Sequence, residues 1–184
     1  MTSPVDDEAL PRGIAPVGDG PLHVHFDGAC QPPRGGGVAT FGFTVEGPGL
    51  YYEESGLATR PYGDHATNNV AEYVAAIRAL EWIRGQGYRG EVTVSGDSQL
   101  VIRQFEGTYE VRKEHLKAYH ERLHQLASEF RSCRFEWVPR EENRRADELS
   151  KEALLAAAEE ARRYRPYRRA GLGTGPAPEP RSDD

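Results

Sequence analysis

The hydrophobic pattern changes its period several times along the chain, and this succession restricts the possible folds more than any other feature. Apolar residues from Leu22 to Phe26 alternate with polar ones, which predicts a strand that ends at Asp27. Segments 38–47 and 50–59 have further strand patterns on either side of a Gly-Pro-Gly turn. We therefore expect these two segments to form a hairpin.

From Asn68 onward the spacing becomes helical. Apolar side chains recur at three- and four-residue steps until Gly85 and Gly87, which predicts an amphipathic helix with a glycine stop. Asn143 is a favourable N-cap for the last helix. The later segments are predicted as a strand, a short helix, a longer helix, a strand and a last helix, at 91–97, 98–107, 116–130, 133–139 and 144–161. The order β-β-β-α-β-α-α-β-α predicts an α/β fold, with a mixed five-stranded sheet (three antiparallel strands, then parallel ones) and helices on both faces.

The length of 184 residues fits one domain with loose ends. We expect residues 1–20 to be a flexible leader, 21–160 the folded domain, and 161–184 an Arg-rich and then Gly/Pro-rich flexible tail. No apolar run approaches the ~20 residues of a membrane span, and the acidic start does not resemble a signal peptide. The sequence therefore predicts a cytoplasmic protein.

The formal net charge is -6, so a nucleic-acid-binding role would require a local basic patch or bound metal. The two cysteines, Cys30 and Cys133, lie far apart and form no CxxC pattern. This spacing argues against a disulfide framework or a structural zinc site.

Four acidic residues stand where open α/β sheets build sites. Asp27 and Asp97 close predicted strands, whereas Glu72 and Asp147 lie in the first turns of predicted helices. Each alone is more often a turn residue or a helix-dipole partner. Together in one crevice they would repel each other unless a cation neutralised them. Hard oxygen ligands select Mg²⁺ or Mn²⁺ over zinc, and two such ions can serve phosphoryl transfer.

The segments VHFDGAC, ATNNVAEY, SGDSQLVIRQF and WVPREENRRADELSKEA resemble, in order and spacing, the four motifs of ribonuclease HI. The resemblance covers nearly all of 21–158 and is greatest to the compact archaeal and bacterial branch. It implies a ribonuclease H fold and endonucleolytic cleavage of the RNA strand of RNA–DNA hybrids, leaving 5′-phosphate and 3′-hydroxyl ends. It also implies two Mg²⁺ ions, with Mn²⁺ as an alternative, bound by Asp27, Glu72, Asp97 and Asp147.

The same resemblance implies substrate contacts. Thr67 matches a residue that holds a phosphate of the DNA strand, and Asn68, Asn69 and Gln99 match minor-groove contacts. Cys30 matches a residue that lies against the hybrid, although a small buried hydrophobe explains it equally well.

Two loops depart from the family pattern. The loop PREEN lacks the histidine that many members carry, so Arg140, Glu141 or Glu142 is expected to replace it. The loop QPPRGGG lacks a usual asparagine, and Arg34 is expected to offer a phosphate contact instead.

The chain has no lysine-rich insertion between its second and third helices. The tail contains a cluster of arginines, Arg162, Arg163, Arg165, Arg168 and Arg169. This cluster is either a solvated end or a source of attraction for the nucleic-acid backbone.

Other functions fit the sequence less well. His23, His25 and Asp27 share a strand face and suggest a metal trio, but the chain is too short for an amidohydrolase barrel of ~250 residues. The two histidines are therefore interpreted as core or supporting residues. A non-catalytic binding module on the same fold and a nuclease that also cuts duplex RNA remain as alternatives. An exonuclease or integrase of this fold fits poorly, because the segments TNNVAEY and GDSQLVI do not match the contexts of their acids. We expect a monomer without an obligate protein partner.

Overall fold

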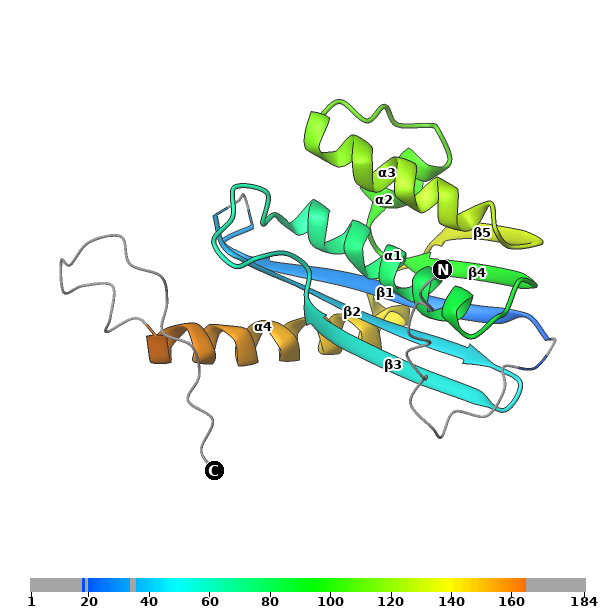
Figure 1. Ribbon diagram of the computed structural model, residues 1–184, viewed down its shortest axis with the longest axis horizontal. Coiled ribbons are helices and arrows are strands. Elements are labelled where there is room, and N and C mark those ends of the chain that lie inside the picture. Colours follow the sequence, from blue (N-terminus) through cyan, green and yellow to red (C-terminus); the bar gives the residue numbers. More distant parts are fainter. Residues whose placement is uncertain (1–17, 19, 34–35, 165–184) are drawn as a thin grey trace, which may run out of the picture.

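The computed structural model describes residues 18, 20–33 and 36–164, and these build one five-stranded sheet in the order β3-β2-β1-β4-β5 (Figure 1). The strands are β1 (Leu22–Gln31), β2 (Val38–Gly47), β3 (Leu50–Leu57), β4 (Glu91–Gly96) and β5 (Ser132–Trp137). β1 pairs with β2, and β2 with β3, in antiparallel fashion, whereas β1 with β4 and β4 with β5 are parallel. The predicted mixed sheet is confirmed.

The helices are α1 (Asn68–Gly85), α2 (Gln99–Phe105), α3 (Glu114–Ala127) and α4 (Arg144–Tyr164), and a 3-10 turn η1 (Arg140–Glu142) precedes α4. Figure 1 shows α1, α2 and α3 on one side of the sheet and α4 on the other. The expectation of helices on both faces is therefore confirmed. No helix among the described residues combines the length and the apolar character that crossing a membrane requires.

The main core lies between α1 and the sheet. Phe26 and Phe43 of the sheet and Tyr73, Leu80 and Ile83 of α1 are completely buried there. The alternation along β1 follows from this packing, because its even-numbered residues face α1 and its odd-numbered residues face the α4 side. Burial of large apolar side chains at this interface is the main force that holds α1 against the sheet.

The ends of α1 agree with the sequence pattern. Thr67 precedes the helix, and its hydroxyl accepts a hydrogen bond from the backbone N–H of Val70 at 3.3 Å. The helix ends at Gly85, and Gly87 follows with φ +78°, a left-handed conformation that glycine adopts without strain.

Several predicted boundaries were wrong. β1 does not end at Asp27 but continues to Gln31, because the residues after Asp27 keep pairing with β2. Glu72 lies just beyond the first turn of α1, which contains no acidic residue. Helix α4 continues past the expected end at Ala161 to Tyr164.

Asn143 precedes α4, but it does not cap the helix as expected. Its side-chain amide donates to the Phe26 carbonyl and to Asp97, and its side-chain oxygen has no hydrogen-bond partner. Most of the expected leader and tail, together with Arg34, Arg165, Arg168 and Arg169, lies outside the described residues. Arg162 and Arg163 belong to α4, although their side chains also lie outside the description.

Candidate active site

The sheet opens between β1 and β4, and this opening positions the site. The two strands pair only as far as His25 and Ser95. Beyond that point β1 continues alongside β2, whereas β4 ends at Gly96. Asp27 on β1 and Asp97 directly after β4 therefore flank the opening. In open α/β sheets, the crevice outside the carboxyl ends of neighbouring parallel strands is the usual ligand site.

Two glycines let helices approach the sheet at the opening. A Cβ atom on Gly28 would lie 2.3 Å from the backbone nitrogen of Glu72, so α1 passes in close contact with β1. A Cβ atom on Gly42 would lie 2.6 Å from the backbone nitrogen of Ser150, so α4 passes equally close to β2. Gly42 is the strand partner of Asp27. Helices from both faces thus bring their acidic residues to Asp27.

All four predicted acids line one cavity of about 380 Å³, together with Asn68, Arg140 and Lys151. They come from four different elements of the fold: Asp27 from β1, Glu72 from α1, Asp97 from the residue after β4, and Asp147 from α4.

Asp27 is 8% exposed and accepts a hydrogen bond from the hydroxyl of Ser150 on α4. Burial raises the pKa of Asp27 to about 6; the Ser150 hydrogen bond opposes the rise, and the charges of Asp97 and Asp147 add to it. The carboxyl group is therefore protonated more readily than an ordinary aspartate.

Glu72 is held by two donors from other parts of the site. The Ser98 hydroxyl donates to Oε2 at 2.5 Å, and the Asn68 side-chain amide donates to Oε1 at 3.0 Å. Burial raises the pKa of Glu72 to about 7, in spite of these hydrogen bonds, and the charges of Asp27 and Asp97 contribute further. Without a bound cation, Glu72 is thus partly protonated near neutral pH.

Asp97 and Asp147 have different surroundings. Asp97 accepts from the amide of Asn143 at 3.2 Å. Asp147 pairs at 2.6 Å with both Arg140 and Lys151. Burial by itself would raise the pKa of Asp147, but the hydrogen bonds from Lys151 and Arg140 outweigh it and lower the pKa. Within the described residues, no three histidine, cysteine or acidic side chains already stand together as a metal cage.

The other predicted residues differ in their positions. Asn68 and Cys30 line the cavity, but the buried Cys30 Sγ lies 3.1 Å from the carbonyl oxygens of both Pro32 and Ala66, which share its single S–H donor. This favours the interpretation of Cys30 as a small buried residue.

Three further candidates for substrate contact lie outside the lining of the cavity, at the starts of helices. Thr67 caps α1, Asn69 lies half-buried in its first turn, and Gln99 is exposed at the first position of α2.

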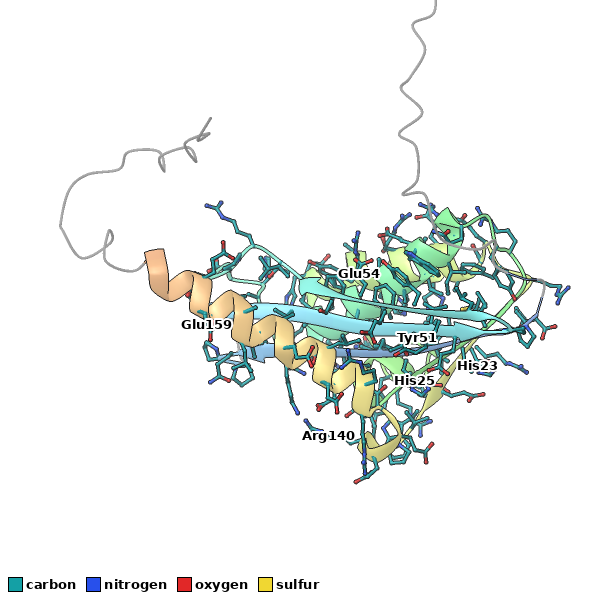
Figure 2. The ribbon with its side chains drawn as sticks, turned by 90° about the horizontal axis from the view of Figure 1, so that it is seen from below. His23, His25, Tyr51, Glu54, Arg140 and Glu159 are labelled. Atoms are coloured by element: carbon teal, nitrogen blue, oxygen red, sulfur yellow. The ribbon has the colours of Figure 1, made fainter. Side chains whose placement is uncertain are left out.

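Among the candidates for the missing histidine, Arg140 lines the cavity, whereas Glu141 and Glu142 are exposed and do not. His23 is exposed and His25 half-buried on the side of the sheet that carries α4, and Figure 2 shows Arg140 near the start of that helix. His23 is therefore not a core residue.

Sequence reasoning missed four residues that hold the acids: Ser98, Asn143, Ser150 and Lys151. Ser150 and Lys151 lie three and four positions after Asp147, which is the spacing of neighbours on one helix face. The spacing of four residues could therefore have predicted the ion pair between Lys151 and Asp147 from the sequence. The contact of Ser150 with Asp27 spans 123 positions and depends on the packing of α4 on the sheet.

Comparisons with known proteins agree with this arrangement. A family model described as reverse transcriptase-like matches residues 54–153. The chain is 37% identical over 153 residues to ribonuclease HI of Halobacterium salinarum, a match that covers 83% of this chain and 72% of that protein. The crystal structure of RNase H1 from H. salinarum NRC-1 has a TM-score of 0.63 and 37% identity, covering 73% of this chain and 98% of that one.

LC11-RNase H1, whose structure was solved in complex with an RNA/DNA hybrid, has a TM-score of 0.65 and 34% identity. That match covers 74% of this chain and 99% of the LC11 protein. The sequence similarity extends over most of the chain, and the solved relatives share its fold. The chain therefore belongs to the ribonuclease HI family.

Proposed function

We propose that this chain is an endonuclease that hydrolyses the RNA strand of RNA–DNA hybrids and leaves 5′-phosphate and 3′-hydroxyl ends. The observation that carries the proposal is the convergence of carboxylates from four elements on one cavity. A protein that only binds nucleic acid gains nothing from clustered negative charge where phosphates must approach. The relative solved with an RNA/DNA hybrid supports the class of substrate.

The donor set fits hard divalent cations. Asp27, Glu72, Asp97 and Asp147 supply carboxylate oxygens, which favour Mg²⁺, with Mn²⁺ as an alternative. The thiol of Cys30 is engaged with backbone carbonyls and does not compete as a ligand. Two such ions, when bound, activate a water molecule and stabilise the leaving oxygen in phosphoryl transfer. We propose these four residues as the ligands.

The surrounding residues position the acids. Ser98 and Asn68 orient Glu72, Ser150 orients Asp27, and Asn143 orients Asp97. Each donor leaves further carboxylate lone pairs free for a cation, because an ionised carboxylate has about four acceptor sites. The carboxylates are thus held in place by the protein itself.

Arg140 lies in the loop where many relatives carry a histidine. A guanidinium has no acceptor and stays protonated, so Arg140 cannot take up a proton during the reaction. We propose that it stabilises negative charge at the cavity instead. This role is consistent with its position, since it lines the cavity and pairs with Asp147.

Substrate recognition is proposed for the beginnings of α1 and α2. Thr67 is assigned to a phosphate of the DNA strand, because the first N–H groups of a helix favour anions. Asn68, Asn69 and Gln99 are assigned to the minor groove, where proteins detect the 2′-hydroxyls that distinguish RNA from DNA. Asn68 also donates to Glu72, so it links the substrate-binding residues to the carboxylates.

Cleavage of end-labelled hybrid, duplex RNA and duplex DNA, each with Mg²⁺ or Mn²⁺, tests the proposal. We expect cleavage of hybrid that is abolished by Asp97→Asn and unchanged by Glu121→Gln, a matched loss of charge at an exposed position of α3. A folded Asp97→Asn protein that cuts at the normal rate would refute the assignment of the site. Equal cutting of duplex RNA would instead refute the restriction to hybrids.

A further inference from the structure

Two histidines of α3 face each other away from the carboxylate cavity. His120 and His124 lie one helical turn apart, on one face of the helix. Their Nε2 atoms are 3.1 Å apart, and their rings meet nearly edge to face at an angle of 65°. His124 is exposed and His120 half-buried, so the pair opens to solvent.

Each ring is held by a separate contact with α2. Phe105 stacks on His124, with ring centroids 4.3 Å apart and planes within 8° of parallel. The backbone carbonyl of Gln104 lies 3.1 Å from Nε2 of His120. Phe105 is itself fixed by stacking on Phe135 of β5. Both nitrogens are therefore pre-positioned, and little side-chain entropy remains to be lost when they bind a ligand.

The His124 imidazole is also in a suitable charge state. Burial lowers the pKa of His124, and the neighbouring His120 lowers it further. The neutral form, which carries the lone pair that a metal needs, is therefore favoured near neutral pH.

The spacing of the nitrogens matches the bite of a single metal ion. With metal–nitrogen bonds of ~2.05 Å, typical of zinc, two nitrogens 3.1 Å apart subtend roughly 98° at the metal. This angle lies between square-planar and tetrahedral values. We propose that His120 and His124 bind one divalent transition-metal ion of the class that prefers imidazole, such as Zn²⁺ or Cu²⁺, with water and the Gln104 carbonyl as further ligands.

This site differs in chemistry from the carboxylate cavity. Borderline ions favour imidazole nitrogen, whereas Mg²⁺ favours carboxylate oxygen, so the two sites select different metals. The ion would join α3 to the carboxyl end of α2. The other end of α2 begins after Ser98, which donates to Glu72. A metal ion at the histidine pair would thus stabilise α2, the helix that follows Asp97, without taking part in hydrolysis.

Calorimetric titration of the full chain with Zn²⁺ in excess Mg²⁺ tests the proposal, since the excess Mg²⁺ keeps the carboxylates occupied. We expect His124→Gln and His120→Gln each to remove one equivalent of bound Zn²⁺ or to weaken its binding at least about tenfold. His115→Gln is the matched control, because His115 also lies on α3 but stacks on His65. Unchanged Zn²⁺ stoichiometry and affinity in both test variants would overturn the proposal.

Cu²⁺ provides a second measurement that does not depend on activity. The electron paramagnetic resonance spectrum of the Cu²⁺-loaded wild type should show two coordinating nitrogens, and that of His124→Gln one or none. Identical nitrogen couplings in the two proteins would also overturn the proposal. Circular dichroism of each variant checks its folding, which we expect to be retained because His124 is exposed.

Discussion

Replacing Glu72 by glutamine should stabilise the metal-free protein at alkaline pH. The pKa of Glu72 rises from 4.5 to about 7 in the folded state, mainly through burial. The folded protein therefore keeps a proton that the unfolded chain has already lost, and raising the pH from 4.5 to 7 disfavours the folded state. Glutamine is neutral throughout. Its amide can still accept from Asn68 and donate to the hydroxyl of Ser98, so both polar contacts survive.

The size of the effect follows from the shift. At ~1.4 kcal/mol for each pKa unit, ionising Glu72 in the folded state costs up to about 3 kcal/mol. For a chain of this size, at about 2–4 °C for each kcal/mol, that corresponds to an increase of roughly 6–12 °C in melting temperature. The gain in stability of Glu72→Gln over the wild type should be complete above pH 7 and absent below pH 4.5.

Urea unfolding in EDTA between pH 4 and 8.5 measures this difference, with Glu121→Gln as the exposed control. Under the proposed function, saturating Mg²⁺ should stabilise the wild type and so reduce its difference in stability from the Glu72→Gln variant. The variant should also lose hydrolysis of hybrid. A stability difference that is the same at pH 4.5 and pH 8 would refute the argument from burial. So would a variant that is less stable than the wild type at pH 8.

Three further changes test other parts of the structure. Lys151→Met should lower the half-saturating Mg²⁺ concentration by up to about fivefold, because Lys151 would no longer compete with Mg²⁺ for Asp147 and their exposed ion pair contributes at most ~1 kcal/mol. A higher Mg²⁺ requirement than in the control Lys117→Met would contradict this. Gly42→Ala should destabilise the protein by about 1–3 kcal/mol in urea unfolding, since the new Cβ would lie 2.6 Å from a backbone nitrogen of α4; an unchanged midpoint would show that the helix can shift freely. Asn69→Ala should raise KM for hybrid and leave Mg²⁺ affinity unchanged. A loss of Mg²⁺ affinity with KM unchanged would contradict the assignment of Asn69 to substrate recognition.

Local patterns predicted the order of the elements. Alternation in β1 and helical spacing in α1 are properties of neighbouring residues, and the structure has both elements close to the expected places. The motif acids were also identified from the sequence, because motif order is visible without coordinates. In the structure all four line one cavity.

Contacts between distant elements were decided only by the tertiary structure. β1 continues past Asp27 because β2 is there to pair with it, and nothing near Asp27 in sequence records that partner. Asn143 resembles a helix cap, but the folded chain offers it Phe26 and Asp97 instead.

The raised pKa values have the same origin. Asp27 and Glu72 are ordinary acids in the unfolded chain, and they become weaker acids only when α1 and α4 close over the opening of the sheet. Gly28 and Gly42 permit that approach by having no Cβ atom. Periodicity describes which face of an element is apolar, but burial and electrostatic fields depend on what packs against that face. The residues that we propose for the site are therefore readable from the chain, whereas their charge states follow from its packing.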